Sequence, residues 1–172
     1  LLHPGEKRLV FCQSRAQTEK LATELRARDV TTVVSHSSLS ADERRRAEQT
    51  FAEAAECVVV ATSTLELGVD IGDLDRVVQL DAPNSVASFL QRLGRTGRRP
   101  GSRRNILFLA TTDTGLVQSA ALLDLWAAGF VEPVVPPPAP AHIAAQQLLA
   151  LALQEGRYSL AEWRQWWTGL NW

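Results

Sequence analysis

The sequence predicts an α/β fold, in which a doubly wound parallel sheet is flanked by helices. The first observation is that short runs rich in Val, Ile and Leu recur along the chain, and the second is that segments with helical periodicity separate them. Because the apolar runs are continuous rather than alternating, we expect strands that are covered on both faces. The five expected strands are residues 8–12, 31–35, 57–61, 76–80 and 105–110.

Capping residues indicate where several helices begin. A Ser followed three residues later by Glu or Gln can form a capping box, in which each side chain binds the backbone N–H group of the other residue. Two such pairs follow the first and second strands, and a third lies near the end of the chain. The pairs are Ser14–Gln17, Ser40–Glu43 and Ser159–Glu162.

The chain changes character near residue 130, so we expect one domain over residues 1–131. Residues 132–140 read EPVVPPPAP, and these five prolines predict a stiff linker because proline continues neither a helix nor a central strand. Residues 141–172 are expected to form a helical segment. It begins with the amphipathic stretch AHIAAQQLLALAL.

Three tryptophans in the last stretch, SLAEWRQWW, have the spacing of one helical face. We expect them to pack in a core or against another domain. Stacking on nucleic-acid bases is the alternative. The three residues are Trp163, Trp166 and Trp167.

The composition is that of an ordinary globular protein, with 172 residues, 45% hydrophobic and 22% charged. No apolar run reaches the roughly 18 residues of a membrane span, and the N-terminus lacks a signal-peptide pattern, so we expect a cytoplasmic protein without a membrane partner. Cys12 and Cys57 lie in apolar strand-like runs, which favours buried, unreactive thiols over a disulfide or a structural metal site. Since the chain begins without Met, we expect it to be a piece of a longer protein.

Polar side chains follow four of the expected strands. The carboxyl ends of parallel strands share one edge of the sheet, where ligands bind, and small hydroxyl and amide groups there can hold phosphates without sequence preference. Helix capping uses the same residue types, but their recurrence at four strand ends favours binding. The stretches are Gln13-Ser14-Arg15, Ser35-His36-Ser37-Ser38, Thr62-Ser63-Thr64 and Asp81-Ala82-Pro83-Asn84-Ser85.

The stretch QRLGRTGR, residues 91–98, begins a strongly positive segment. Six arginines and no acid occur between Gln91 and Arg104. Gly94 and Gly97 let the backbone approach a ligand closely, and guanidinium groups bind phosphate oxygens in pairs. A solvated loop is the alternative, but the regular Arg-x-x-Arg spacing favours an anion site. The arginines are Arg92, Arg95, Arg98, Arg99, Arg103 and Arg104.

Several nucleotide-binding motifs are absent from the sequence. A Walker A loop requires Gly-Lys-Ser/Thr, whereas Lys7 and Lys20 each follow a glutamate. The acidic pair Asp42-Glu43 falls at a helix start, where capping explains it. No GxGxxG follows the first strand, which argues against a Rossmann-type dinucleotide enzyme. We therefore expect that the chain does not hold Mg-ATP by itself.

Four stretches together resemble motifs IV, IVa, V and VI of the second, C-terminal RecA-like domain of superfamily 2 helicases, in order and in spacing. The resemblance covers roughly residues 6–130. TSTLELGVDIG and the downstream EPVVPPP are most similar to the Lhr (large helicase-related) family, although Arg-Thr-Gly-Arg-Arg stands where that family often has Arg-Ala-Gly-His. The stretches are RLVFCQSRAQTEKLATEL, SHSSLSADERRRAEQTF, VVVATSTLELGVDIGDLDRVVQLDAP and FLQRLGRTGR.

The resemblance implies an ATP-dependent motor whose ATP and Mg²⁺ lie between two RecA-like domains and are held mainly by the first. The second domain supplies arginine fingers. By position in the motifs, Arg95 and Arg98 would reach the γ-phosphate and Gln91 would help to position it. Gly68 and Asp70 would line the nucleotide through its ribose.

The resemblance also implies contacts to the sugar-phosphate backbone of single-stranded DNA or RNA. The expected protein partners are the first RecA-like domain of the same polypeptide and a downstream winged-helix domain, of which residues 141–172 would be the start. The alternative is a non-catalytic nucleic-acid-binding module, for which no Walker A or DExH sequence would precede the chain. The expected contact residues are Ser14, Arg15, Ser35, His36, Thr62 and Ser63.

Overall fold

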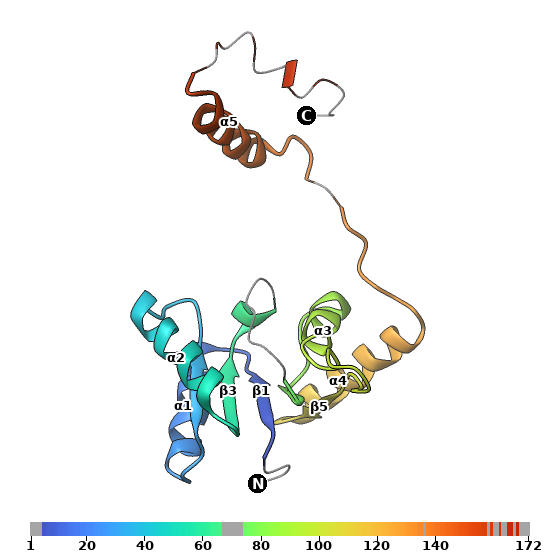
Figure 1. Cartoon of the computed structure of the whole chain (residues 1–172). Helices are drawn as coiled ribbons and strands as arrows, with labels where there is room; N and C mark the ends of the chain where they lie inside the picture. The colour runs from blue at the N-terminus through green and yellow to red at the C-terminus, as the bar shows by residue number, and fades with distance from the viewer. Residues whose placement is uncertain are drawn as a thin grey trace. The chain divides into compact units, whose positions relative to one another are not determined.

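A computed structural model describes residues 5–66, 74–135 and 137–157, and residues 159, 162, 165, 166 and 168. The chain forms two compact units, Leu1–Glu132 and Pro133–Trp172. The first unit alternates strands and helices (Figure 1). Its elements are β1 (Lys7–Phe11), α1 (Arg15–Arg26), β2 (Thr32–Ser35), α2 (Ala41–Glu53), β3 (Cys57–Ala61), the 3-10 helix η1 (Ser63–Leu65), β4 (Arg76–Leu80), α3 (Val86–Leu93), β5 (Ile106–Leu109) and α4 (Asp113–Ala127).

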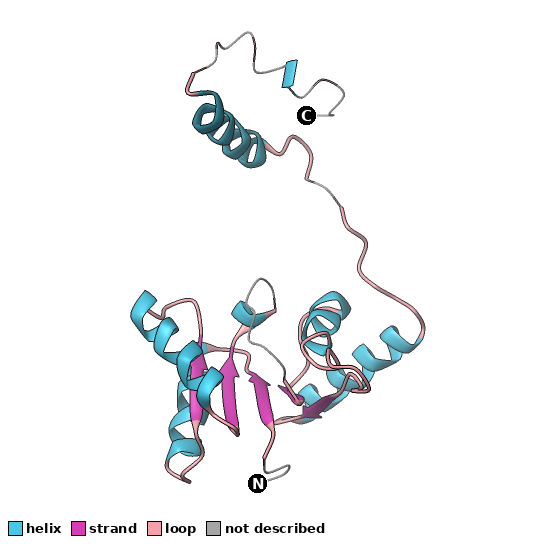
Figure 2. Cartoon of the chain, viewed as in Figure 1, coloured by secondary structure: helices cyan, strands magenta, loops and turns pink. Residues whose placement is uncertain are grey.

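The five strands form one parallel sheet in the order β2-β3-β1-β4-β5 (Figure 2). In the centre of the sheet, Val10 of β1 is level with Val60 of β3 and Val78 of β4. All five expected strands are present, with ends that differ by one residue at most. The predicted doubly wound parallel fold is therefore confirmed.

Hydrophobic side chains cover both faces of the central strands. On one face, Phe11 and Val59 pack with Phe51 of α2. On the opposite face, Val10 and Val60 pack with Ala22 of α1 and its neighbours. The continuous apolar runs in the sequence are explained by this two-sided burial.

β5 departs from the expectation of two covered faces. It lies at the edge of the sheet, and Leu109 is 43% exposed. One face of β5 carries Phe108, whose ring centroid is 5.9 Å from that of Phe89 on α3. The other face borders an open apolar groove, because α1 lies mainly against β2 and β3 rather than against β5. The groove is lined by Arg8, Val10, Leu21, Leu25, Val58, Arg76, Val78, Leu80, Leu107 and Leu109.

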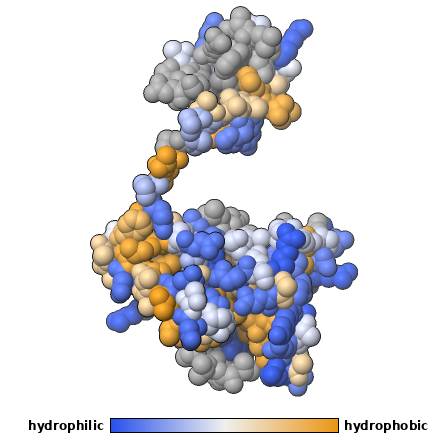
Figure 3. Space-filling model, turned by 180° about the vertical axis from the view of Figure 1, so that it is seen from behind, coloured by the Kyte–Doolittle hydropathy of each residue, from blue (hydrophilic) through white to orange (hydrophobic). Residues whose placement is uncertain are grey.

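α4 packs against α3 through aromatic rings. Phe89 meets Trp126 of α4 edge to face, with 5.5 Å between the ring centroids, and Leu122 is buried beside them. The opposite side of α4 exposes Leu116 and Val117, and Figure 3 shows apolar surface on the part of the first unit that carries this helix. α4 is thus apolar around most of its circumference, which is typical of helices that are covered by a partner.

The predicted capping pairs form to different extents. Ser40 and Glu43 form a complete capping box, so capping accounts for Glu43 of the acidic pair Asp42-Glu43. Ser14 accepts from the Gln17 N–H group, but the Gln17 side chain accepts from the amide of Gln13 instead of that of Ser14. In the second unit, the reciprocal bonds between Ser159 and Glu162 are both present.

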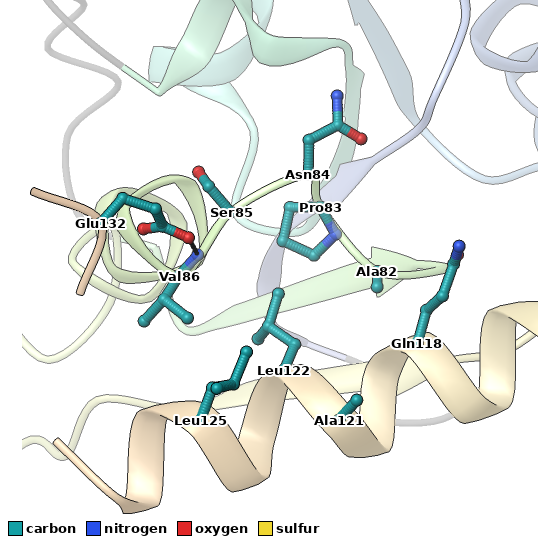
Figure 4. Close-up of a pocket in the computed structure, with 10 residues that line it drawn as sticks. All are labelled: Ala82, Pro83, Asn84, Ser85, Val86, Gln118, Ala121, Leu122, Leu125 and Glu132. Atoms are coloured by element: carbon teal, nitrogen blue, oxygen red, sulfur yellow. Dashed lines mark hydrogen bonds between the residues drawn. The ribbon is translucent and has the colours of Figure 1, made fainter. Parts of the chain in front are cut away.

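Glu132, which we expected to begin the linker, is fastened to the first unit. Its two carboxylate oxygens accept hydrogen bonds from the amides of Val86 (2.8 Å) and Ala87 (2.9 Å) at the start of α3. Figure 4 shows this carboxylate at the rim of a pocket of about 350 Å³, which Leu122 and Leu125 of α4 border from the other side. These amide bonds hold the pKa of Glu132 below its usual value. The unit that follows begins at Pro133.

The second unit contains the expected amphipathic stretch as helix α5 (Ala141–Glu155), which ends at Gly156 with a φ of 74°. Trp163 and Trp167 lie outside the described residues. Trp166 is 54% exposed. The predicted packing of the three indoles therefore stays a prediction.

Both cysteines are free and buried, as expected. Burial raises the pKa of each thiol, which keeps it protonated and unreactive. Among the described residues, no helix has the length and apolar character needed to cross a bilayer.

Replacing Glu132 with Gln tests the hydrogen bonds between its carboxylate and the amides at the start of α3. A lowered pKa in the folded state means that the carboxylate stabilises the fold above its unfolded-state pKa, and that this contribution disappears as the pH falls through the folded-state pKa. We expect Glu132→Gln to lower Tm by a few degrees near pH 7, with the difference from the native chain narrowing below about pH 4.5.

Thermal unfolding followed by circular dichroism across this pH range measures the effect. Glu24→Gln is the matched control, because Glu24 is exposed on α1 and far in sequence from α3. A Tm difference for Glu132→Gln that stayed constant from pH 7 to pH 3 would contradict the assignment.

Candidate functional site

The sheet brings the predicted strand-end residues together at one edge. The order β2-β3-β1 places the ends of these strands side by side, and backbone hydrogen bonds connect the turns beyond them. The Thr62 amide donates to the Ser35 carbonyl at 3.3 Å, and the Cys12 amide donates to the Ala61 carbonyl at 2.8 Å. Ser14, Ser35 and Thr62 thus lie on three adjacent turns.

The exposed groups at this edge come from all three turns. Arg15, the first residue of α1, is exposed and donates to the Ser37 hydroxyl at 2.7 Å. Ser63 is exposed, and Thr62 precedes η1 without a side-chain capping bond. A cation, hydroxyl groups and the amide end of α1 therefore share one edge, which is the combination that binds phosphate groups.

His36 is positioned differently from an exposed contact residue. Its side chain is only 8% exposed, and its Nε2 lies 2.6 Å from Oε1 of Glu19 on α1. The pair ties the turn after β2 to α1, four residues after Arg15. His36 accordingly supports this edge through Glu19, and its predicted contact with nucleic acid stays a prediction.

The carboxylate at the end of β4, that of Asp81, binds another residue of the first unit. Asp81 has a positive φ of 54°, and its side chain accepts from both the amide and the hydroxyl of Thr111, at 2.7 and 2.6 Å. These bonds join the end of β4 to the turn before α4. Ser85 caps α3 by accepting from the amide of Ser88. At this strand end Ser85 therefore caps a helix and Asp81 binds the turn before α4.

Arg92, which we counted with the positive segment, is a buried structural residue with 5% exposure. Its guanidinium group donates to the Glu66 carboxylate and to Oε1 of Gln79 (2.5 Å), and it lies over the ring of Phe11 at 4.6 Å from the centroid. Arg99 also has an acidic partner, Asp75 at 3.1 Å. The positive charge of the segment is therefore smaller than the sequence indicates.

Arg95 and Arg98 lie just beyond the end of α3. Arg95 is partly buried and donates through Nη2 to the backbone carbonyl of Glu66, whereas Arg98 is exposed and donates through Nε to the Gly94 carbonyl at 3.1 Å. Burial, and secondarily the nearby charge of Arg98, lower the pKa of Arg95. Two like charges are thus held close together, an arrangement that an anionic ligand stabilises.

The remaining predicted nucleotide residues are only partly described. Gln91 is exposed on α3, one turn before Arg95. Gly68 and Asp70 lie outside the described residues. Glu66 and Gln79 are not predictable as site residues from the sequence, because nothing in the local pattern shows that Arg92 requires them as buried partners.

The arginine loop after α3 is closed at its base by Thr96 and Asn105. The fully buried Thr96 hydroxyl donates to the Asn105 carbonyl at 3.0 Å and accepts from its amide at 2.9 Å. Thr96 also forms a parallel bridge with Leu74. Because Leu74 and Asn105 lie just before β4 and β5, the base of the loop lies at the amino ends of these strands, away from the edge that carries Ser14 and Thr62.

No group of three or more His, Cys, Asp or Glu side chains gathers into a metal site within the described part of the chain. The cationic and hydroxyl groups that do gather suit phosphate groups rather than a metal ion.

Comparisons with known proteins agree with the motifs. The family model of the helicase conserved C-terminal domain matches residues 1–100. The Lhr helicase/uracil glycosylase of Escherichia coli (strain K12) is 41% identical over 128 residues, which are 74% of this chain and 8% of that protein. The ATP-dependent helicase Lhr-Core of Methanocaldococcus jannaschii is 31% identical over 156 residues, 90% of this chain and 18% of that protein. The chain thus spans less than a fifth of these relatives.

Solved structures support the same fold. The structure of Mycobacterium smegmatis helicase Lhr bound to ssDNA and AMP-PNP matches with a TM-score of 0.72 and 32% sequence identity, covering 87% of this chain and 20% of that chain. The RecA-like fold expected from the resemblance is confirmed.

Replacing Gly97 with Ala tests the close packing at the base of the arginine loop. Gly97 has a φ of +71°, and a Cβ atom there would lie 2.5 Å from the backbone N of Arg104. We expect Gly97→Ala to lower the free energy of unfolding by about 2 kcal/mol or more, from backbone strain together with the steric clash. Denaturation in urea measures this change.

Gly101→Ala is the matched control, because Gly101 has a similar φ of +78° but no heavy atom within 4 Å of a Cβ. Gly101→Ala should lower the free energy of unfolding only by the backbone strain, about 1 kcal/mol. Equal effects of the two substitutions would show that the close approach at Gly97 does not exist.

Proposed function

Because the chain belongs to the helicase conserved C-terminal domain family, we propose that it is the second motor domain of an ATP-dependent, Lhr-like helicase. In this role it contributes arginine fingers to ATP hydrolysis and holds the backbone of single-stranded nucleic acid. The whole motor then requires a first RecA-like domain, which we expect upstream in the same polypeptide, and a winged-helix domain downstream.

The observation that carries this proposal is the pair of guanidinium groups beyond α3. Arg95 is partly desolvated, Arg98 is solvent-exposed, and they lie close enough for the charge of Arg98 to lower the pKa of Arg95. An incoming γ-phosphate relieves this repulsion and accepts hydrogen bonds from both groups. An arginine finger contributes on the order of 10³ to 10⁵ to the rate, or roughly 4 to 7 kcal/mol of transition-state stabilisation.

The other half of the ATP site is assigned to the first domain. The sequence has no Walker A loop, and the described residues hold no acidic metal cluster. Mg²⁺ with ATP would therefore be held mainly across the cleft. Gln91, one turn before Arg95, is placed to help orient the γ-phosphate, and Gly68 and Asp70 would approach the ribose.

Nucleic acid is assigned to the edge formed by the carboxyl ends of β1, β2 and β3. Hydroxyl groups and the start of α1 bind phosphate groups irrespective of base sequence, which a translocating motor requires. The proposed contacts are Ser14, Arg15, Ser35, His36, Thr62 and Ser63. DNA and RNA share this backbone chemistry.

The two sites suggest how hydrolysis is coupled to movement. ATP favours the closed arrangement of the two motor domains, because Arg95 and Arg98 gain a partner that is absent when the cleft is open. Hydrolysis and phosphate release remove that difference in binding. Each cycle then shifts the strand relative to this domain, in the 3′ to 5′ direction expected for such helicases.

A non-catalytic nucleic-acid-binding module is the second candidate, since the edge around Ser14 and Thr62 alone could bind a strand. The arginine pair favours the motor, because a module that binds only a strand has no use for a partly buried guanidinium group beside an exposed one. The gene sequence upstream of Leu1 discriminates between them through its Walker A and DExH motifs.

We expect Arg95→Ala or Arg98→Ala, in the complete protein, to reduce ATP turnover by about 10³-fold or more while ATP still binds. Steady-state hydrolysis with saturating single-stranded DNA and binding of a fluorescent ATP analogue measure the two effects. Arg103→Ala is the control from the same loop. Native turnover in both finger variants would reject this assignment.

Arg15→Ala should weaken binding of single-stranded DNA and lower the dependence of log K on log salt by about 0.7, the value for one phosphate contact. Fluorescence anisotropy with a labelled oligonucleotide at several salt concentrations gives this slope. Arg28→Ala, beyond the other end of α1, should leave it unchanged. Equal slopes for the Arg15 variant and the native protein would count against this edge as the strand site.

A further inference from the structure

Glu66 is the residue through which the segment after β3 is attached to α3. Its side chain is 14% exposed, and Oε1 accepts hydrogen bonds from the Ser88 hydroxyl (2.9 Å) and from Nε of Arg92 (2.8 Å). Nη2 of Arg92 donates to the same oxygen. The carboxylate is thus held by donors from two successive turns of α3.

The partner of Glu66 is itself fixed to the sheet. Nη1 of Arg92 donates to Oε1 of Gln79 on β4, and the guanidinium plane lies over Phe11 of β1. The Gln79 amide donates in turn to the carbonyls of Leu80 and Asp81, at 3.1 and 2.8 Å. Glu66 is therefore connected to the neighbouring strands β1 and β4 through a buried network whose atoms have little freedom to move.

The backbone carbonyl of the same residue holds Arg95. Nη2 of Arg95 donates to the Glu66 carbonyl, so the residue that binds Arg92 with its side chain binds the proposed finger with its main chain. A movement of the Glu66 backbone therefore displaces a hydrogen-bond acceptor of the Arg95 guanidinium group.

We propose that Glu66 is a positioning residue for Arg95: its carboxylate, locked by Arg92 and Ser88, fixes the carbonyl that aims the finger. This inference rests on the proposed function, in which Arg95 acts on the γ-phosphate. Glu66 acts through Arg95 in this proposal, since its carboxylate is bound to Arg92 and Ser88. Its loss should therefore lower kcat with little change in the KM for ATP, because a misaligned finger weakens binding of the transition state more than that of the ground state.

The first test is Glu66→Gln in the complete protein, assayed for ATP turnover with saturating single-stranded DNA. We expect kcat to fall about 10- to 100-fold, the range for a misplaced catalytic group, while KM changes less than about threefold. A native kcat in folded Glu66→Gln protein overturns the proposal, and so does a loss that appears in KM alone.

A second variant covers the case in which Glu66→Gln does not fold, since it leaves the buried Arg92 without its counter-charge. Glu66→Asp keeps the charge and shortens the side chain by one methylene group. It should lower kcat in the same selective way but to a smaller extent, and a native kcat for this variant together with an unfolded Glu66→Gln overturns the proposal.

Glu6→Gln is the matched control. It removes the carboxylate from another partly buried arginine pair, Arg76 with Glu6 at 3.0 Å, which lies at the amino ends of β1 and β4. It should lower Tm without lowering kcat. An equal kcat loss in Glu6→Gln would show that general destabilisation, and not finger alignment, causes the effect.

The closing experiment combines the substitutions and compares binding of ADP with aluminium fluoride, which resembles the transition state, with binding of AMP-PNP. Glu66→Gln should weaken the first more than the second in the native background, but not in the Arg95→Ala background, where no finger remains to be aimed. If Glu66→Gln still selectively weakens binding of ADP with aluminium fluoride in the Arg95→Ala background, the positioning role alone is overturned. If the Arg95→Ala protein keeps the native ratio of the two binding affinities and the native rate of ATP turnover, the finger assignment is overturned as well.

Discussion

The burial of one positive charge constrains the centre of the first unit. An arginine side chain that is only 6% exposed must have its charge balanced and its N–H groups bound, because the desolvation penalty is otherwise several kcal/mol. Arg92 meets this requirement with a carboxylate, an amide and an aromatic face, from Glu66, Gln79 and Phe11. These partners come from three separate segments, so the single charge sets how the segment after β3, the two central strands and α3 fit together.

The same packing separates the two candidate sites. α3 begins beyond the carboxyl end of β4 and runs back toward the amino ends of the strands, where Thr96 closes the arginine loop. The strand-end hydroxyl groups remain at the opposite edge. Arg95 spans part of this distance by reaching the Glu66 carbonyl. A domain that binds a strand at one place and a triphosphate at another can link the two only through rigid elements, and α3 together with the Glu66–Arg92 pair is such an element.

The arginine-rich segment shows why residue type alone does not assign a role. In QRLGRTGR the three arginines have equal spacing, yet Arg92 is buried, Arg95 is half-buried and Arg98 is exposed. The spacing places Arg92 on the inner face of α3, while α3 ends at Leu93 and the next two arginines follow a different backbone path. His36 illustrates the same point, since its place in a polar turn suggested an exposed contact and its ring is buried against Glu19.

Local pattern determined the five strands, the helix starts at Ser14 and Ser40, and the motifs that indicate the family, because strand hydrophobicity and helix capping depend on neighbouring residues. Tertiary structure alone decided that Glu66 and Gln79 are partners of Arg92, that β5 keeps one face open, and that Glu132 belongs to the first unit. Each of these depends on side chains or strands that are distant in the sequence. The sequence shows which residues carry a charge. Which residue pairs with each charge depends on the segments that the packed sheet brings within hydrogen-bonding distance.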